Sequence, residues 1–461
     1  MNTIRKATRL GAAAGIVICA GGFAALADSE IVAIYTKIPT DPSSIVPGAL
    51  DENGDPVVEN FRALERLFLS PDGSMWIVKG RTQQVSALQN VMIIGSGDTG
   101  NWFAQSGQPI PGGAPGEIYN FFGSAIGQFN DNNEFAFTAR ATGGSNAVFQ
   151  KVLVYTGGPV PDLSDFDLVA QMGDLYAGLV DNPPENSGDE TIGNSIGSIH
   201  ILNDGTLGAH DPTIQNISAL RRPAIFYRAP GENERFEMFH QNAVTTVTGL
   251  GGVGIELWKN LSNNAFYTAP DGSVWVAKGQ VDQPTSIDGV LVVDGEVVIQ
   301  EGFPIPGSTV VPGGSFDGIT TFDVRSNGNW YARGLITGGA GSWAVHNGIV
   351  VAQTGDEIFP GADERWTTFQ IFTGNANGDW ILLGNTDNPD PARDSVMVLN
   401  GEELLVREGD PVTVSGVKGA AFIGRGNLTA GAFTGDSAIS DTMAMSTSWP
   451  ICAARPTEAW T

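Results

Sequence analysis

Pro270-Asp271-Gly272-Ser273-Val274-Trp275-Val276-Ala277-Lys278-Gly279 is the stretch that decides the fold of this chain. It returns almost unchanged as Pro71-Asp72-Gly73-Ser74-Met75-Trp76-Ile77-Val78-Lys79-Gly80. Asp-Gly is expected at the centre of a tight turn, because both residues adopt positive φ at low cost. The apolar run that follows, from Val274 to Ala277, is typical of a strand buried on both faces. One turn and strand recurring along a chain predicts a repeat architecture.

The composition places the chain in the all-β class. Its 461 residues include 61 glycines and 26 prolines, while charged residues make up only 16 per cent and apolar residues 41 per cent. These proportions are typical of many short strands joined by tight turns, and not of a disordered chain.

Two motifs alternate along the sequence. The first is an Asp-Gly or Asn-Gly turn followed by apolar residues, with Asn133 in place of Gly in one copy. The second is an apolar strand that runs into a Gly-acid-x-apolar-Pro-Gly turn, most clearly at residues 350–361. The turn residue of the first motif falls at positions 73, 133, 205, 272, 328 and 378.

These spacings predict a β-propeller. Successive turns lie 50 to 72 residues apart, and each unit contains close to four strands. Such a unit, repeated six or seven times, is the signature of propeller blades. A β-solenoid is the alternative, but its repeats are shorter and need no hairpin turns.

The N-terminal segment is expected to close the ring. Residues 30–39 match the second motif without a preceding partner, so we predict a strand that completes the last blade. A seventh blade would account for this strand and for the unit that begins at residue 405. The predicted repeat domain spans residues 28–436, with six to seven roughly four-stranded blades. Residues 40–60 and 175–198 are aperiodic, so we expect loops on one rim.

Residues 1–27 have the features of a secretory signal peptide: a basic start, a short apolar run and Ala25-Leu26-Ala27 as the cleavage site. The apolar run is too short for a membrane anchor. We therefore expect a secreted, cell-surface or periplasmic monomer without a membrane span after cleavage. Removing the signal changes the formal charge from −26 to −29, which disfavours nucleic acid as a partner. Cys452 is then the single cysteine, so no internal disulfide is expected.

Residues 437–461 depart from the repeat pattern and form an irregular tail. Reading codons 442–455 from each third base restores the Gly, Val and apolar positions of the turn motif. We hypothesise a shift of reading frame shortly before Ser437; the alternative is a coincidence allowed by codon degeneracy.

The tandem units, with Asn-Asp-x-x-x-Phe-Ala-Phe at residues 130–137, resemble a family of secreted bacterial repeat proteins of the choice-of-anchor type. That family is described by an Asn-x-x-Gly-x-x-x-Ala-Phe repeat, and the resemblance covers residues 30 to 435 or so. It implies a signal peptide, a propeller-like fold and an exported or cell-surface location. It implies no chemistry.

No residue cluster predicts a catalytic, metal or cofactor site. The sequence has no cysteine between the signal and the tail, no Gly-x-Ser-x-Gly elbow, and no phosphate loop in the glycine-rich runs 249–254 and 312–314. Residues 51–55 alternate acids like an EF-hand, but Pro56 and Arg62 occupy the Gly and Glu positions, so an acidic surface turn is expected. Four histidines lack metal-ligand spacing and are expected to be structural: His200, His210, His240 and His346.

Two classes of function remain open. The first is a non-catalytic exported propeller that binds a surface polysaccharide or protein through rim loops, with binding residues still unknown. The alternative is a carbohydrate-active hydrolase or lyase at the mouth of the propeller channel, although no carboxylate pair can be singled out. The repeated tryptophans could offer a sugar-stacking platform, but their matching positions favour blade packing: Trp76, Trp275, Trp330 and Trp380.

The signal peptide leads to the first prediction. Cleavage after Ala27 should leave Asp28 as the first residue of the exported protein. N-terminal sequencing of exported material measures this directly, and an intact Met1 in that material would contradict it.

Overall fold

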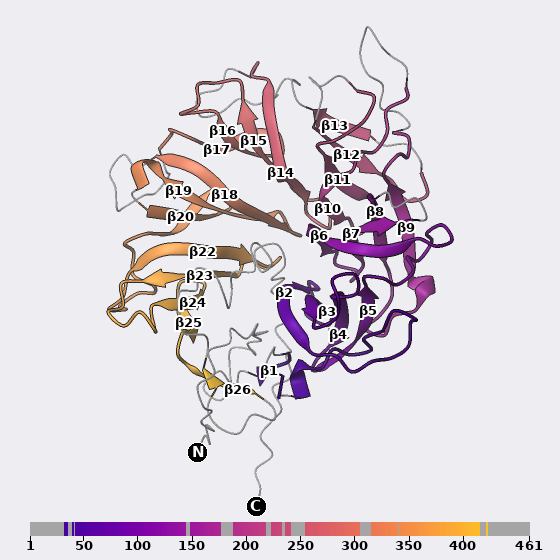
Figure 1. The fold of residues 1–461 in the computed structure, drawn as a ribbon. Helices are drawn as coiled ribbons and strands as arrows, with labels where there is room; N and C mark the ends of the chain where they lie inside the picture. The colour runs from indigo at the N-terminus through magenta and orange to yellow at the C-terminus, as the bar shows by residue number, and fades with distance from the viewer. Residues whose placement is uncertain are drawn as a thin grey trace, which may run out of the picture.

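Six antiparallel sheets of four strands surround a common centre (Figure 1), which confirms the predicted all-β propeller. In each sheet the spatial order of the strands is their order in the chain, so every blade is one continuous stretch. The computed structural model describes residues 32–35, 39–40, 42–143, 148–176, 188–217, 223–232, 236–240, 254–304, 315–339, 341–414 and 421–422.

We number the blades 1 to 6 in chain order. Blade 1 contains β2 (Phe61–Leu69), β3 (Trp76–Thr82), β4 (Asn90–Ser96) and β5 (Thr99–Gln105). Blade 2 contains β6 (Ile118–Phe129), β7 (Phe135–Thr142), β8 (Val148–Tyr155) and β9 (Phe166–Gln171). Blade 3 contains β10 (Gly197–Ile201), β11 (Leu207–Asp211), β12 (Ala224–Arg228) and β13 (Phe236–His240).

The other three blades follow the same plan. Blade 4 contains β14 (Trp258–Thr268), β15 (Trp275–Val281), β16 (Gly289–Val293) and β17 (Glu296–Gln300). Blade 5 contains β18 (Phe316–Arg325), β19 (Asn329–Ile336), β20 (Gly341–His346) and β21 (Ile349–Gln353). Blade 6 contains β22 (Trp366–Gly374), β23 (Trp380–Thr386), β24 (Ser395–Leu399) and β25 (Glu403–Arg407). Short 3-10 helices lie at η2 (Pro42–Ser44), η3 (Leu163–Asp165) and η5 (Thr337–Gly339).

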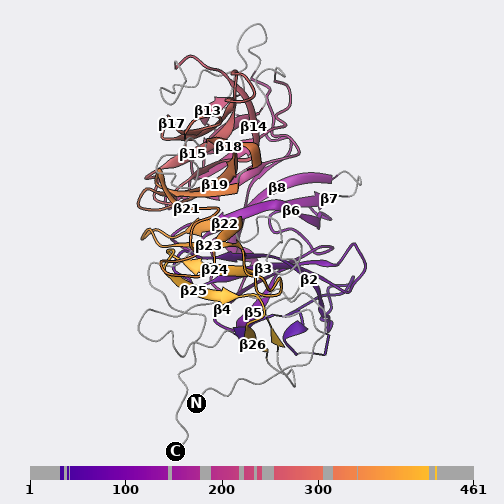
Figure 2. The same ribbon diagram turned by 90° about the vertical axis from the view of Figure 1, so that its left-hand side faces the viewer.

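The first strand of each blade lies nearest the centre, and the first strands of neighbouring blades from blade 1 to blade 6 are in contact. Because the strands are antiparallel, the turns after the first and third strands lie at one end of the propeller, which we call the turn face. The connections after the second and fourth strands lie at the other end, the loop face. Figure 2 shows the blades edge-on, with β7 and β8 extending beyond their neighbours.

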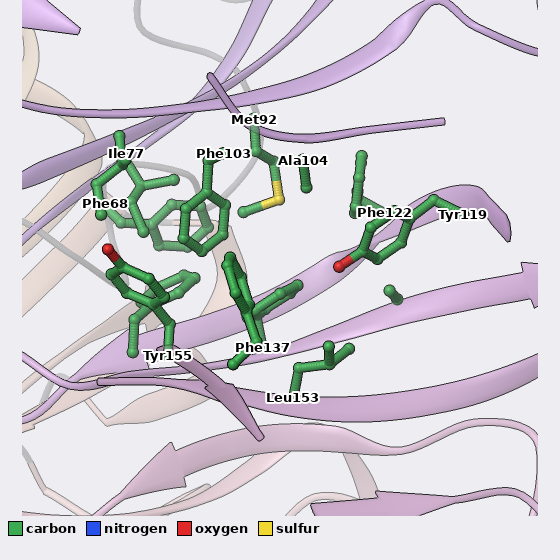
Figure 3. Packing of buried hydrophobic residues seen from close by; sticks show 14 of the residues in the cluster. Phe68, Ile77, Met92, Phe103, Ala104, Tyr119, Phe122, Phe137, Leu153 and Tyr155 are labelled. Atoms are coloured by element: carbon green, nitrogen blue, oxygen red, sulfur yellow. The ribbon is translucent and has the colours of Figure 1, made fainter. Parts of the chain in front are cut away.

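The core lies between the blades. The largest buried cluster joins blades 1 and 2: Phe68 and Phe103 from blade 1 contact Phe135 from blade 2 at ring-centroid distances of 5.1 and 6.4 Å (Figure 3). Further clusters lie between each of the following pairs of blades. A sheet that is apolar on both faces needs a neighbour on each side, which is why the units assemble into a ring.

The Asp-Gly turns differ in detail from the expectation. Gly272 has a φ of 73° and donates its N–H to the Ala269 carbonyl at 2.8 Å, but Asp271 does not adopt positive φ. Pro270 and Asp271 are therefore the two central residues of this turn, and both have negative φ. Gly272, which follows them, is the residue with a left-handed conformation. Two successive residues do have positive φ in the blade 5 copy, at Asn327 (65°) and Gly328 (72°), and in turns after third strands, as at Asn347 (47°) and Gly348 (81°). Asn133 does replace Gly, with a φ of 64°.

The ring contains six four-stranded blades, the lower of the two predicted numbers, and the N-terminal strand closes it by pairing with the segment that follows blade 6. β1 (Val32–Ala33) does not join blade 6; it pairs in parallel with β26 (Pro411–Val414), which pairs with β27 (Ala421–Phe422). This three-stranded sheet lies between β25 and blade 1 in Figure 1. Tyr35, just after β1, packs on Phe61 and Trp76 of blade 1 at centroid distances of 5.1 and 5.6 Å. The N-terminal segment thus covers blade 1 with side chains as well as pairing through a strand.

The predicted signal peptide 1–27 and the tail 437–461 lie outside the described residues, as does most of the glycine-rich run 249–254 and all of 312–314. Within the described residues, no helix is long and apolar enough to cross a membrane.

The hairpin at Gly272 yields a mutational prediction. Gly272→Val should lower the free energy of unfolding by about 1–3 kcal/mol, because a β-branched residue is forced to positive φ. The space itself is open, since an added Cβ would meet only a Leu202 methyl at 4.0 Å. Gly272→Asn is the matched control and should lose much less, as Asn133 occupies the equivalent position in blade 2. Denaturant unfolding measures both; equal stability of the Val variant and the parent would contradict the assignment.

Candidate functional site

The turn face is built from hydrogen bonds between the turns of successive blades. Asn133 of blade 2 donates to the Asp72 carboxylate of blade 1 at 2.9 Å, and Asn203 of blade 3 donates to Asp131 of blade 2 at 2.8 Å. Further round, the N–H of Asn327 donates to Asp271 at 2.7 Å. The Asp and Asn residues of the repeat therefore hold neighbouring turns together.

One contact crosses the centre. The Ser326 hydroxyl of blade 5 donates to the Asp131 carboxylate of blade 2 at 2.5 Å, although the residues are 195 positions apart. Blades 2 and 5 lie on opposite sides of the ring, so their turns meet across the axis. The groups named here are engaged with one another, although the buried Oδ1 of Asn133 has no hydrogen-bond partner among the described residues.

The tryptophans are packing residues, as predicted. Trp76, Trp330 and Trp380 are buried, and Trp275 is half-buried. The backbone N–H of Trp330 donates to Asn347 at 2.8 Å, and that of Trp380 donates to Asn400 at 2.7 Å. Each such bond joins the second strand to the turn after the third strand, so the tryptophan marks a structural junction and not a sugar platform.

His200 and His346 have structural partners. The Nδ1 of His200 donates to the Ser198 carbonyl at 2.7 Å, and its Nε2 accepts from the Thr268 N–H of blade 4 at 3.2 Å. Burial lowers the pKa of His200 to about 4, which keeps the ring neutral. His346 stacks on Tyr331 at 4.6 Å. The described residues contain no group of three or more potential metal ligands, and the side chain of His240 lies outside the description.

His210 is different, because it is fully buried and neither ring nitrogen has a hydrogen-bond partner. Burial lowers its pKa to about 3. An unsatisfied buried imidazole costs stability.

Asp288 and Glu301 are two carboxyl groups that the fold brings together at the loop face of blade 4. Burial raises the pKa of Glu301, and the neighbouring Asp288 adds to this rise. Lys259 forms an ion pair with Asp288 at 3.1 Å. A carboxyl group whose pKa is raised beside a second carboxyl is a candidate for acid-base catalysis.

The position of Glu301 in the repeat gives it a structural role that does not require catalysis. Its carboxylate accepts from the N–H of Gly289, which begins the third strand, at 3.0 Å. In blade 1 the Ser106 hydroxyl accepts from the N–H of Asn90 at 3.0 Å, and in blade 5 Thr354 accepts from Ser342 at 2.8 Å. Glu301 thus fills a position whose role in other blades is to fasten the third strand to the end of the fourth.

The acidic turn at residues 51–55 is also structural. The Asp51 carboxylate accepts from the N–H groups of Asn53 and Asp55 at 2.8 and 2.9 Å, and these bonds lower its pKa. The carboxylate caps its own loop, which agrees with the expected surface turn.

Apolar side chains are exposed mainly at the loop face. Among the described residues, eleven large apolar side chains are exposed, and three of them belong to the turn face: Val160, Leu163 and Ile349. The other eight lie in loop-face connections or at the adjoining strand ends: Ile45, Val58, Val85, Phe121, Met172, Leu175, Ile255 and Leu335. The predicted rim loops at 40–60 and 175–198 precede first strands, so their described parts belong to this face.

The second strands of several blades carry a cation at the same repeat position. In five blades the first strand makes two register shifts against the second, which leave backbone groups of the first strand unpaired. Lys278 of blade 4 donates to the freed Thr320 carbonyl of blade 5 at 3.1 Å, and Arg333 of blade 5 donates to Phe369 of blade 6 at 3.1 Å. Both cations stand three residues after the repeated tryptophan, and so does Lys79.

Lys79 contacts an acid and an aromatic ring. Its ammonium forms an ion pair with Glu65 of its own blade at 3.1 Å and lies 5.1 Å above the Phe121 ring of blade 2. Arg81 forms a second ion pair with Glu65. Burial lowers the pKa of Lys79; Glu65 opposes this effect, while Arg66 and Arg81 reinforce it. Sequence reasoning missed this cluster, although the repeated Lys79 and Lys278 were a visible signal.

Comparison with known proteins gives no functional assignment. No protein-family model and no curated protein matches the chain. Solved structures with some similarity include the β-propeller domain of the Trilobed protease from Pyrococcus furiosus (10% identity, TM-score 0.41, covering 77% of this chain and 88% of that one). Apo prolyl oligopeptidase B from Galerina marginata matches at 11% identity and TM-score 0.40, covering 77% of this chain but only 46% of its own.

A polysaccharide lyase, the PL25 ulvan lyase bound to -[GlcA(1-4)Rha3S]-, matches at 9% identity and TM-score 0.32, covering 84% of this chain and 98% of that one. At such identities and scores, none of these similarities bears on activity.

His210 generates a pH prediction. Its pKa is about 3 in the folded protein and 6.5 when exposed, so the unfolded state binds more protons between these values. His210 therefore removes up to about 1.4 kcal/mol of stability per pH unit as the pH falls through this window. His210→Phe should flatten the curve of unfolding free energy against pH between 6 and 4. It should also stabilise the fold, because an unsatisfied polar ring is replaced by an apolar one.

The control is His346→Phe, whose half-buried ring has a hydrogen-bond partner in Asn329 and should affect the slope less. Parallel curves for the parent and His210→Phe would show that His210 is not held neutral.

Proposed function

We propose that this chain is an exported, non-catalytic propeller that binds a surface polymer through its loop face. The observation that carries the proposal is the unequal distribution of exposed apolar side chains, eight of eleven of which belong to that face. Exposed apolar surface on a folded protein marks an interaction site when it gathers on one side. Loops on a rigid scaffold are also the usual place for recognition.

Export is supported by the signal-peptide features of residues 1–27 and by the resemblance to secreted repeat proteins. The turn face is a poor candidate for binding, because its polar groups are engaged between blades.

The alternative, a carbohydrate-active enzyme, has one observation in its favour: the raised pKa of Glu301 beside Asp288. The strand-fastening role of Glu301 argues against it, since Ser106 and Thr354 perform the same task without a carboxylate. We therefore place binding first.

The test compares two triple variants on an array of purified neutral and acidic polysaccharides. Val58→Ser, Val85→Ser and Ile255→Ser together alter the loop face; Val160→Ser, Leu163→Ser and Ile349→Ser alter the turn face. All six side chains have matched exposure, between 65% and 77%. The loop-face variant should lose retention at least tenfold, because each apolar side chain contributes roughly 1.5–3 kcal/mol when fully buried. The turn-face variant should bind like the parent.

Turnover is measured on the same array. We expect neither reducing sugar nor unsaturated product. Product release that Glu301→Gln abolishes would establish the enzyme reading, and equal binding by both triple variants would refute the loop face as the binding surface.

A further inference from the structure

The innermost strand of most blades repeats one irregularity at its loop-face end. In blades 1, 2, 4, 5 and 6, the first register shift against the second strand leaves one extra residue in the first strand. Each extra residue directly follows an aromatic residue that is no more than 3% exposed: Phe61, Tyr119, Trp258, Phe316 and Trp366. The extra residues are all exposed, and we call them the axial residues: Arg62, Asn120, Lys259, Asp317 and Thr367. Because the first strands surround the centre (Figure 1), the axial residues lie around the propeller axis at the loop face.

Comparison of the blades separates what the fold requires at this place from what it leaves free. The aromatic rings belong to the buried apolar clusters, so their size is fixed by packing. The axial position has the same strand register and is exposed in five blades, yet it holds five different side chains. Packing therefore does not determine the axial side chain.

Blade 3 shows a structural role at the corresponding place. Its register shift falls between Gly197 and His200, and Ser198 is fully buried with a φ of 50°. The Ser198 hydroxyl accepts a hydrogen bond from the Phe266 N–H of blade 4 at 3.3 Å. The exposed side chains at the axial positions of the other blades are not held in this way, so they can contact a ligand.

The axial residues offer hydrogen-bond donors and acceptors together. Arg62 only donates, the Asp317 carboxylate only accepts, and the Asn120 amide does both. The two remaining axial side chains already have contacts within their own blades and are less available. A hydroxyl group both donates and accepts, so a ligand with several hydroxyl groups can bond to all of these side chains.

Two exposed apolar side chains adjoin the axial residues. Phe121 directly follows one of them and is 38% exposed, with the Lys79 ammonium 5.1 Å from its ring centroid. Leu335 is 49% exposed and lies opposite Gly318, which follows another axial residue. Binding sites usually combine apolar side chains with a few polar groups that fix the orientation of the ligand. A sugar ring matches this combination, because it has an apolar C–H face and hydroxyl groups at its edge.

The local charges disfavour strongly charged ligands. A polyanion would approach the Asp317 carboxylate and a protein of formal charge −26. A polycation would approach Arg62 and Lys259, which are exposed cations. A neutral chain avoids both repulsions.

We infer that the axial residues recognise a neutral polysaccharide at the propeller axis. Their polar groups bind sugar hydroxyls, and an exposed side chain such as Phe121 contacts the apolar face of a sugar ring. The inference rests on the proposed binding function, and it names both the ligand class and the residues that determine specificity.

The experiment measures binding of the full chain to four soluble neutral polysaccharides, dextran, laminarin, galactomannan and xyloglucan, by surface plasmon resonance. Polygalacturonate is the acidic comparison. The parent should bind at least one neutral polysaccharide more tightly than polygalacturonate. Arg62→Gln, Asn120→Ala and Asp317→Asn should each weaken binding about two- to tenfold, the effect of one lost hydrogen bond. The loss should differ between polysaccharides, because their hydroxyl groups differ in orientation. Phe121→Ala should weaken the binding of all of them by a similar factor.

Asp98→Asn is the matched control for Asp317→Asn. It makes the same chemical change at an exposed acid of blade 1, in the turn between β4 and β5 at the turn face. It should leave every affinity unchanged. Asp317 adds to the rise in the pKa of Glu301, so its removal relieves a repulsion and should not unfold the protein. Thermal unfolding checks this for every variant.

Three results would overturn the inference: no binding of the parent to any of the four neutral polysaccharides, tighter binding of polygalacturonate than of all four, or affinities in the three axial variants equal to those of Asp98→Asn. If one of these appears while the loop-face triple variant still loses retention on the array, the axial site is wrong and the binding face stands. If the parent binds no polysaccharide of either kind, both proposals fail.

Discussion

Every blade of this propeller must bury both faces of its sheet against a neighbour, and the other features of the fold follow from that constraint. The apolar clusters lie between successive blades and not inside any one of them. Blade 1 has no complete blade before it. Its free face is covered by Tyr35, Val46 and Ala49, which pack with Phe61 and Trp76. Side chains of the N-terminal segment thus do for blade 1 what a seventh full blade would have done.

The two ends of the propeller serve different purposes. At the turn face the repeat residues hold one blade to the next, so each substitution there affects an inter-blade bond. The loop face also has bonds between blades, such as those of Lys278 and Arg333, but its connections vary in length and carry most of the exposed apolar residues. The cations of the second strands are one example of contacts between blades. Lys278 and Arg333 donate hydrogen bonds to the next blade, and Lys79 at the same repeat position pairs with Glu65 and lies over the Phe121 ring of the next blade.

Much of the fold could be predicted from sequence, because turn chemistry is local. Gly272, Asn133 and the repeated tryptophans were assigned correctly, since each position depends on a few neighbouring residues. The choice between six and seven blades could not be made from the sequence, because it depends on whether a weakly patterned segment packs through strands or through side chains, as at Tyr35. The contacts of Lys79 could be predicted only in part. Its repeat position, shared with Lys278, is visible in the sequence, but Arg66 lies opposite Lys79 only beside a bulge, and Phe121 belongs to the next blade.

The contact between Ser326 and Asp131 has a kinetic meaning. It joins residues 195 positions apart, and it can form only when the turns of blades 2 and 5 have both reached their places in the ring. Contacts that close such long stretches of chain carry a large entropic cost and form late in folding. Interactions absent from the folding transition state act mainly on the rate of unfolding. The junction at the axis therefore governs how long the assembled ring persists, and with it the resistance of the protein to proteases that cleave the chain once it has opened.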